Sequence, residues 1–282
     1  MEVLNQVENA LKNVYLDVIR HQLNTSDAFV AKIEKTPNDV WGKEIIINVA
    51  TKEEAGEYLQ VISEIKNLAL TIEISDKAIR VAQNSIGAFV DLLNAEMENM
   101  LKEGQQEVLY KPWSLSSLKE LFDANKETLY NIDRKKYNFN PQVKIINEFS
   151  NSEIKKIIDD INPEINFMIC SPKTKRTFIE QQELKRQNVE RIKCNDGLYY
   201  TTFNENNVVI IPYKFMADNE IWLVNSNDFK IHQLCDWEWL TDEDDKILRK
   251  HPVKPIHTAT LVKYCDLICH KPQNQIKIII KS

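Results

Sequence analysis

Glycine is unusually scarce in this sequence, and that scarcity limits the folds available to it. The chain has 5 glycines among 282 residues, about a quarter of the usual share. It contains no G-x-G-x-x-G or G-x-x-x-x-G-K phosphate loop and no G-x-S-x-G nucleophile elbow. Because glycine-rich turns let backbone amides approach phosphates closely, their absence argues against nucleotide-dependent chemistry on the familiar folds.

Charge and hydropathy argue against nucleic acid and membranes as the main binding partners of this chain. The formal net charge is -6, whereas a protein that mainly grips nucleic-acid phosphates usually carries a basic patch. That role is therefore disfavoured. No apolar segment suited to a signal peptide follows Met1, and no apolar run approaches about 18 residues. We expect no membrane partner and a protein made in a reducing cytoplasm.

The cysteines are odd in number and widely scattered, which in a non-secreted chain indicates reduced, mostly buried thiols. They are Cys170, Cys194, Cys235, Cys265 and Cys269. The side chains of the C-terminal half that offer zinc ligation are His232, Cys235, Cys265, Cys269 and His270. If residues 257–269 form a strand, however, Cys265 and Cys269 lie about 13 Å apart on one face, too far to share an ion. We expect packing thiols, no metal, no cofactor and, because no histidine lies in a recognisable nucleophile motif, no catalytic residues.

Helical periodicity is clearest in two stretches of the N-terminal half. Residues 4–23 carry one apolar stripe, and residues 86–103 repeat apolar side chains at three- and four-residue steps. Ser85 and Gly104 suit the two ends of the second helix as its N-cap and C′ residues. A weaker helix is expected over residues 114–122.

Between the first two helices the pattern is that of strands. An Ile-rich strand is expected over residues 44–49, followed by a polar, exposed loop over residues 50–57. Residues 58–62 and 68–74 are again strand-like. Together these segments predict a long, projecting hairpin over residues 44–74.

From residue 143 onward, strands and helices alternate. The expected order is a strand over residues 143–146, a helix that Ser150 or Asn151 caps and Pro163 ends, a strand over residues 165–171 and a helix over about residues 174–189. Such alternation predicts a compact α/β unit over about residues 143–215. The remainder is mostly β, with a long strand over residues 257–269 and a closing strand over residues 276–280.

Several stretches of the chain match a known family, in that family's order. The strongest are GAFVDLLNAEMENMLK (87–102), just after IEISDKAIR, and FKIHQLCDWEW (229–239), followed by KPIHTATLVKY. Weaker ones are YLDVIRHQLNTSDAFVAKIEKT (15–36) and INFMICSP (165–172). In these segments, which together span most of its length, the chain resembles the major capsid proteins of tailed bacteriophages with the Hong Kong 97-type fold.

The resemblance implies an α+β fold of five parts. They are an N-terminal arm (1–40), an extended loop (41–67), a peripheral domain (68–142) with a long spine helix at about 86–103, an axial domain (143–215) and returning peripheral strands (216–282). Two features depart from the family pattern. The extended loop is short and glycine-poor, and residues 105–142 lack an expected glycine-containing turn. These departures bear on shell geometry and not on the fold.

The function that the resemblance implies is structural. Copies of the chain would self-assemble into hexamers and pentamers of an icosahedral head shell that encloses phage or prophage double-stranded DNA without sequence specificity. The expected location is the virion capsid, assembled in the bacterial host cytoplasm with a portal and, because the arm begins almost at residue 1, a separate scaffolding protein. The candidate intersubunit contacts lie in the extended loop: Trp41, Lys52, Glu53, Glu54 and Tyr58. Two alternatives are an encapsulin-like compartment shell and a cytosolic metal-dependent enzyme.

Three motifs have a structural and a functional interpretation. CDWEW (235–239) is expected to be packing of the peripheral domain rather than an aromatic cage, because aromatic residues commonly fill cores. TDEDD (241–245) lacks the glycine and ligand spacing of a cation loop and is expected to be a solvated turn. Lys52 lies where some capsid relatives form a lysine–asparagine crosslink, but the sequence identifies no partner asparagine.

Overall fold

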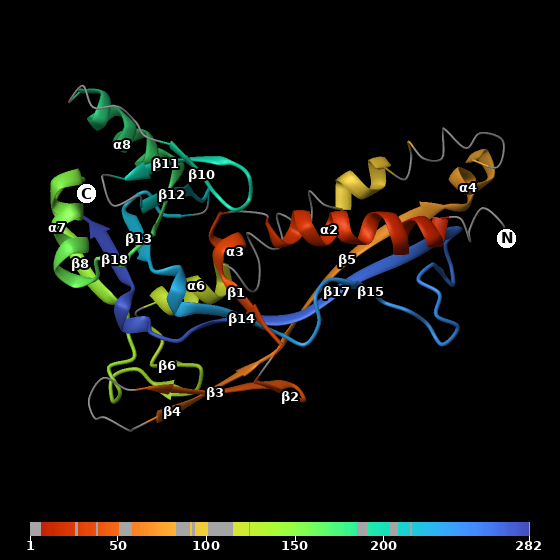
Figure 1. Ribbon diagram of the computed structural model, residues 1–282, viewed down its shortest axis with the longest axis horizontal. Coiled ribbons are helices and arrows are strands. Elements are labelled where there is room, and N and C mark those ends of the chain that lie inside the picture. Colours follow the sequence, from red (N-terminus) through yellow and green to blue (C-terminus); the bar gives the residue numbers. More distant parts are fainter. Residues whose placement is uncertain are drawn as a thin grey trace.

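The computed structural model of the protein is elongated (Figure 1). One end holds a sheet with two helices beside it, a long pair of strands runs towards the other end, and a hairpin projects from one side. The structure describes residues 7–25, 28–37, 39–50, 58–82, 91, 94–100, 115–123, 125–184, 191–203, 208–214 and 216–281. Within these ranges no helix has both the length and the apolar character needed to span a bilayer.

The predicted N-terminal helix is confirmed in its described part. Residues 7–10 are α-helical and lead directly into a π-helical turn and a further α-helix. The elements of this region are η1 (Leu11–Tyr15), α2 (Leu16–Asn24) and α3 (Ala28–Lys32). Its apolar stripe is buried at Leu11, Ile19 and Leu23. We call residues 7–24 the N-terminal helix below.

A six-stranded sheet forms the peripheral part of the molecule. Its strands are β1 (Glu34–Thr36), β5 (Lys66–Ser75), β14 (Phe229–Gln233), β15 (Glu238–Trp239), β16 (Arg249–Lys250) and β17 (Ile256–Cys269). The long β17 confirms the strand predicted over residues 257–269. It pairs antiparallel with β5, from Ile256 opposite Ser75 to Cys265 opposite Lys66, and β14, β15 and β16 also pair with it. The short α4 (Asp76–Ala82) follows β5.

The projecting hairpin is shorter than predicted. It consists of β2 (Val40–Trp41), β3 (Glu44–Ala50) and β4 (Tyr58–Glu64), which form a three-stranded antiparallel sheet. The prediction extended the hairpin to residue 74, but β5 leaves it and joins β17 instead. Alternate residues of β5 are buried from Leu68 to Ile74, and only the broad peripheral sheet offers a core for that face. We call residues 40–64 the extended-loop hairpin.

The axial part is a seven-stranded sheet. In spatial order its strands are β10 (Arg191–Lys193), β11 (Tyr199–Phe203), β12 (Val208–Pro212), β9 (Phe167–Cys170), β13 (Glu220–Val224), β18 (Ile276–Ile280) and β8 (Gln142–Ile146). Its helices are α7 (Asn151–Ile161) and α8 (Pro172–Leu184), which confirm the predicted alternation. Ile154, Ile158 and Phe178 on these helices share one buried cluster with sheet residues. Short 3₁₀ turns, η2 (Ser226–Asp228) and η3 (Pro272–Asn274), precede β14 and β18.

The axial sheet also contains strands from the last part of the chain, contrary to expectation. Residues 216–282 were expected to return to the peripheral domain. In fact β13 pairs with β9, and β18 pairs with β13 and β8. Every residue of β9 is buried, and a buried strand needs hydrogen-bonded neighbours at both edges, which β12 and β13 provide. The predicted domain boundaries themselves remain predictions.

The spine region is described only in part. Residues 94–100 are helical, with Met97 and Met100 buried as the periodicity predicts; the rest of residues 86–103, apart from residue 91, lies outside the described residues. The weaker predicted helix is confirmed as α6 (Leu115–Phe122). After it, β6 (Thr128–Leu129) and β7 (Ile132–Asp133) form a two-stranded hairpin.

Candidate assembly surfaces

The two described contact candidates lie at opposite ends of the extended-loop hairpin. Trp41 is 70% exposed and Tyr58 is 69% exposed. Trp41 pairs with Glu44 at the root of the hairpin, and Tyr58 pairs with Ala50 near its tip. At about 3.3 Å per residue, the length of β3 separates the two aromatic rings by roughly 20 Å. The hairpin therefore offers two separate anchors; Lys52, Glu53 and Glu54 lie outside the described residues.

The opposite face of this hairpin packs on its own subunit. Ile45, Ile47 and Val61 are buried and belong to the same apolar cluster as Leu129 and Ile132 of the β6–β7 hairpin. The Ile62 amide also donates to the Tyr130 carbonyl at 3.3 Å. In Figure 1 the label of β6 lies beside β3 and β4. The hairpin is therefore supported along one face and carries its large aromatic side chains on the exposed surface.

The turn of the β6–β7 hairpin explains how residues 105–142 manage without the expected glycine. Its central residues Tyr130 and Asn131 have φ values of 51° and 63°, the combination required for a type I′ turn. Asparagine tolerates this region, whereas tyrosine is strained in it. The buried Tyr130 hydroxyl accepts a hydrogen bond from the Cys269 amide at 3.2 Å, which ties the turn to the end of β17.

A buried aspartate holds the root of the extended-loop hairpin. Asp266 of β17 is only 1% exposed. Its carboxylate accepts a hydrogen bond from the Ser63 hydroxyl at 2.5 Å and forms an ion pair with the Lys66 ammonium at 3.3 Å. Burial raises the pKa of Asp266, although Lys66 and Ser63 oppose the rise. These contacts lie where β4 ends and β5 begins, beside a groove of about 580 Å³. The hairpin is thus anchored to the centre of the peripheral sheet.

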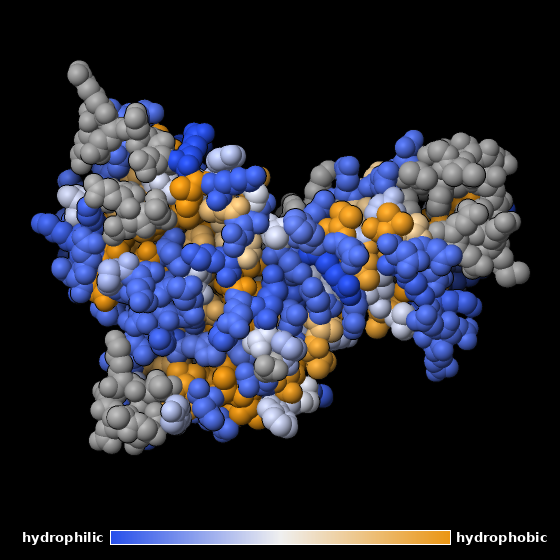
Figure 2. All heavy atoms as spheres, in the orientation of Figure 1, coloured by the Kyte–Doolittle hydropathy of each residue, from blue (hydrophilic) through white to orange (hydrophobic). Residues whose placement is uncertain are grey.

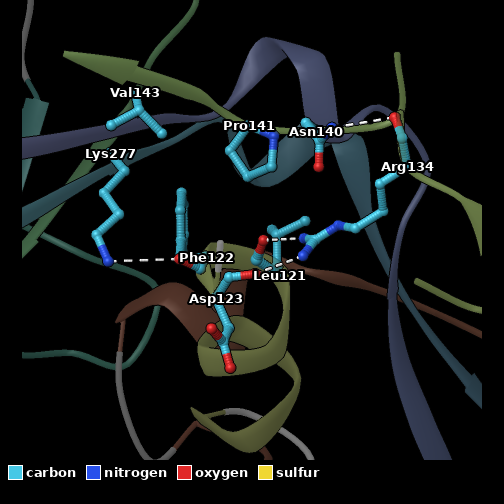
Figure 3. A pocket seen from close by; sticks show the side chains of 8 residues that line it. All are labelled: Leu121, Phe122, Asp123, Arg134, Asn140, Pro141, Val143 and Lys277. Carbon is cyan, nitrogen blue, oxygen red and sulfur yellow. Dashed lines mark hydrogen bonds between the residues drawn. The ribbon is translucent and has the colours of Figure 1, made fainter. Parts of the chain in front are cut away.

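A cavity of about 260 Å³ lies between the C-terminus of α6 and the strands β8 and β18 of the axial sheet (Figure 3). On one side the Arg134 guanidinium donates to the Leu121 and Asp123 carbonyls, and on the other the Lys277 ammonium lies 3.4 Å from the Phe122 carbonyl. Both cations satisfy carbonyls left open at the C-terminus of α6. Burial lowers the pKa of Arg134. This capping fixes α6 against the strand β18.

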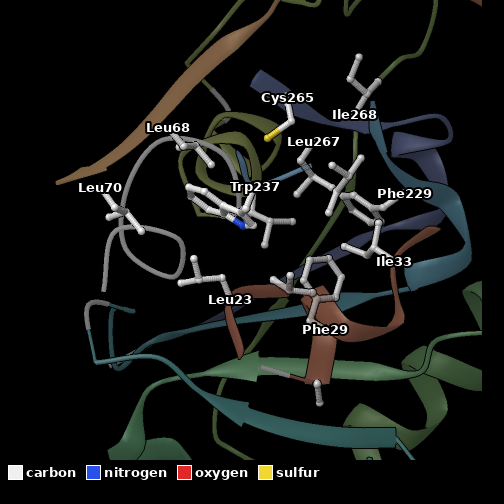
Figure 4. Close-up of a cluster of buried hydrophobic side chains, with 14 of the residues drawn as sticks. Leu23, Phe29, Ile33, Leu68, Leu70, Phe229, Trp237, Cys265, Leu267 and Ile268 are labelled. Carbon is white, nitrogen blue, oxygen red and sulfur yellow. The ribbon is translucent and has the colours of Figure 1, made fainter. Parts of the chain in front are cut away.

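The N-terminal helix packs on the CDWEW segment. The Trp239 indole donates to the Leu11 carbonyl at 3.1 Å, and Arg20 donates to the Trp237 carbonyl at 2.5 Å. Trp237 is 1% exposed and lies among Leu23 and apolar side chains of the peripheral strands (Figure 4). The two tryptophan rings are buried and do not form an open cage, which confirms the packing interpretation.

An ion pair between a buried lysine and a half-buried aspartate joins this packing. Lys263 of β17 is fully buried, and its ammonium donates to Asp236 at 2.9 Å and to the Asn24 side chain at 3.0 Å. Burial alone would raise the pKa of Asp236, but the charge and hydrogen bond of Lys263 lower it below its ordinary value. The C-terminal end of the N-terminal helix, the CDWEW segment and β17 are therefore joined through one cation.

The acidic TDEDD segment forms an exposed turn, as predicted. The Asp242 carboxylate accepts hydrogen bonds from the backbone amides of Asp244 at 3.0 Å and Lys246 at 2.8 Å. Lys12 of the N-terminal helix reaches the Asp245 carboxylate at 3.3 Å. The segment therefore closes on its own backbone and touches the N-terminal helix.

The candidate zinc ligands are three thiols, whose pKa values burial raises, and two imidazoles that lie together. Burial raises the pKa of Cys265 to about 12 and also raises the pKa of Cys269, so these thiols stay protonated. His232 and His270 come together, with their Nε2 atoms 3.3 Å apart. Burial and the neighbouring His232 lower the pKa of His270 to about 4. Across the described ranges, no group of three or more His, Cys, Asp or Glu side chains is placed to hold one ion.

Other exposed apolar side chains were not singled out by the sequence. Val14 and Val18 belong to the apolar stripe of the N-terminal helix, yet both are largely exposed, so the buried face is narrower than predicted. Val143 and Ile145 are exposed on β8, at the edge of the axial sheet. Their two-residue spacing on an edge strand was the available signal. Figure 2 shows hydrophobic patches that interrupt the hydrophilic surface of one face.

Comparison with known proteins identifies the fold. No protein-family model matches the sequence, and no curated protein sequence matches it either. Among solved structures, the capsid of cyanophage A-1(L) matches with a TM-score of 0.60 and 10% identity, over 89% of this chain and 91% of that chain. The SrpI encapsulin of Synechococcus elongatus matches with a TM-score of 0.56 and 13% identity, over 89% and 86% of the two chains.

The chain has the Hong Kong 97-type capsid fold. A virus-like particle from Pyrococcus furiosus matches as well, with a TM-score of 0.52 and 11% identity, over 94% of this chain and 99% of that one. Each match covers nearly the whole of both chains, so the Hong Kong 97-type fold accounts for both the peripheral and the axial sheets. At identities this low the likeness concerns the fold.

Proposed function

We propose that this protein is a major capsid protein that self-assembles into hexamers and pentamers of an icosahedral head shell enclosing phage or prophage DNA. The observation that carries the proposal is the extended-loop hairpin on a Hong Kong 97-type fold. One face of that hairpin is packed on its own subunit, and Trp41 and Tyr58 are left exposed. Large exposed aromatic side chains on a supported scaffold are typical anchors of protein interfaces.

The placement of these anchors supports shell formation. A hairpin that projects from one subunit meets a different surface on its neighbour, and such heterologous contacts close into rings and curved sheets. Permanent interfaces of this kind often bury more than about 2,000 Å². The proposed partners are other copies of the chain, a separate scaffolding protein, a portal, and double-stranded DNA held without sequence specificity. The protein would act in the virion after assembly in the host cytoplasm, and not as an enzyme.

An encapsulin-like compartment is the second candidate. It is supported by the match to an encapsulin subunit, whose TM-score of 0.56 is close to the 0.60 of the cyanophage capsid. The two functions share one architecture and differ in contents. Shells isolated from the native source would contain double-stranded DNA in the first case and a protein cargo in the second, as ultraviolet absorbance and mass spectrometry would show.

The assembly proposal is tested by negative-stain electron microscopy of the purified protein, with its mass in solution measured alongside. We expect closed shells or rings of five or six subunits. Trp41→Ala combined with Tyr58→Ala should abolish them and leave a folded subunit, whereas the exposed Val253→Ser, outside the hairpin, should assemble normally. A strictly monomeric wild-type protein, even when scaffold and portal are co-expressed, would contradict the proposal.

A further inference from the structure

Two histidines meet beside the segment that leads into the extended-loop hairpin. His232 lies in β14, and His270 directly follows β17. Their rings lie 5.5 Å apart between centroids with an interplanar angle of 28°. His232 is 1% exposed, so packing holds its ring in one position. The pair is therefore a preorganised arrangement of two imidazole nitrogens.

We propose that His232 and His270 bind one first-row divalent transition-metal ion through their Nε2 atoms. These atoms are 3.3 Å apart. Two histidine nitrogens bound to one tetrahedral ion at about 2.0–2.1 Å each are separated by about 3.3 Å. An ion can thus be accommodated without moving the backbone of either strand. Nitrogen ligands favour copper, nickel and zinc over magnesium and calcium, which prefer oxygen.

Charged side chains of both signs lie near the pair. The Asp39 carboxylate lies 3.8 Å from the Nδ1 atom of His232, on the far side of the ring from His270. This distance is beyond that of a hydrogen bond, so Asp39 contributes negative charge and does not fix the ring. Lys230 of β14, which is paired with Glu34 at 2.9 Å, contributes a positive charge that opposes Asp39 at His270. The two imidazole nitrogens themselves therefore carry the proposed site.

The site supplies two protein ligands, and water completes the coordination of the ion. Asp39 immediately precedes β2, and its carbonyl accepts a hydrogen bond from the Ile46 amide at 3.0 Å. A bound ion would consequently link β14 to the end of β17, beside the segment that leads into the extended-loop hairpin. Metal binding is independent of shell assembly, because every group involved belongs to one subunit.

The test is calorimetric titration of the chelator-treated full-length protein with zinc, nickel and copper salts in a non-coordinating buffer. We expect one equivalent to bind. His270→Ala should weaken binding by more than about tenfold. His21→Ala, which removes an exposed histidine of α2, is the matched control and should bind as the wild type does.

A second readout uses the unmodified protein, so it does not depend on the variants folding. The electron paramagnetic resonance spectrum of the copper complex should show hyperfine splitting from two imidazole nitrogens. Oxygen-only coordination, no saturable binding by the wild type, or equal binding by a folded His270→Ala variant would each overturn the proposal. Shell assembly would be unaffected by any of these results, so failure of the metal site is distinguishable from failure of the capsid function.

Discussion

The N-terminal helix and the extended-loop hairpin are both attached to β17, but through β17 side chains of opposite charge. Lys263 anchors the helix through Asp236 and Asn24, whereas Asp266 anchors the hairpin root through Ser63 and Lys66. These two β17 residues are three positions apart, so their side chains point to opposite faces of the strand. One strand thus holds a separate appendage on each face by means of a buried charge.

The two anchors differ in how well the buried charge is satisfied. At the helix, the pKa of Asp236 is lowered despite its burial, so the ion pair favours the charged form. At the hairpin root, burial raises the pKa of Asp266 despite its two partners. A buried ion pair that lacks full compensation contributes little net stability. The carboxylate at the helix is therefore better compensated by its partners than the carboxylate at the hairpin root.

The largest expected effect comes from the seat of the N-terminal helix. Trp237→Ala should lower the free energy of unfolding by about 3–5 kcal/mol, because a fully buried tryptophan leaves a large cavity. Trp41→Ala, on the exposed hairpin surface, should change it by less than about 0.5 kcal/mol. Urea denaturation of the dispersed subunit measures both. Equal losses would show that the hairpin aromatic side chains are as well packed as the helix seat.

An intermediate effect should distinguish the two charged anchors. Asp236→Ala leaves Lys263 buried without its carboxylate and should cost about 3 kcal/mol, whereas Ser63→Ala at the hairpin root should cost about 1 kcal/mol. Adding Lys263→Met to the aspartate variant should recover most of the loss, since no buried charge then remains. The same denaturation assay applies. A loss of stability from Ser63→Ala as large as that from Asp236→Ala would show that the two anchors do not differ in this way.

The smallest effect is a difference in acid sensitivity. The lowered pKa of Asp236 contributes stability that is present above its unfolded pKa of about 3.9 and is lost as pH falls through the folded value. The raised pKa of Asp266 has the opposite sign, because its protonation on acidification adds stability between the folded pKa and about 3.9.

Two variants separate these contributions when unfolding free energies are measured from about pH 6 down to about pH 3. Asp236→Asn should lose stability less steeply on acidification than the wild type, and Asp266→Asn should lose it more steeply. Parallel curves for the two variants would show that the anchors do not differ in the way proposed.

Much of the secondary structure could be predicted because it depends on local periodicity. The strand β18 matches its predicted residues, the helix α7 begins directly after Ser150 (one of its two predicted caps) and ends before Pro163, and β17 begins one residue earlier than expected. Each has a strong repeat of apolar side chains over its own length. The exposed Val14 and Val18 mark the limit of this reasoning, since periodicity shows that a face is apolar but not that another element covers it.

The candidate site was predictable only as a region. The sequence placed contact residues on a projecting loop, and the structure leaves Trp41 and Tyr58 exposed there. The anchors of that loop were not predictable, because Asp266 lies about two hundred residues away from Ser63 in sequence. The N-terminal helix and the CDWEW segment were also recognised separately, with no sign that they contact each other.

What the sequence by itself determined about this protein is therefore the order and type of most elements, through side-chain patterns that act over a few residues. The tertiary structure alone decided that β5 joins β17 rather than β4, that β13 and β18 enter the axial sheet, and that His232 meets His270. These outcomes depend on which distant faces bury one another and on which buried polar groups find partners. Such contacts are set by the packing of the whole chain, and no local pattern records them.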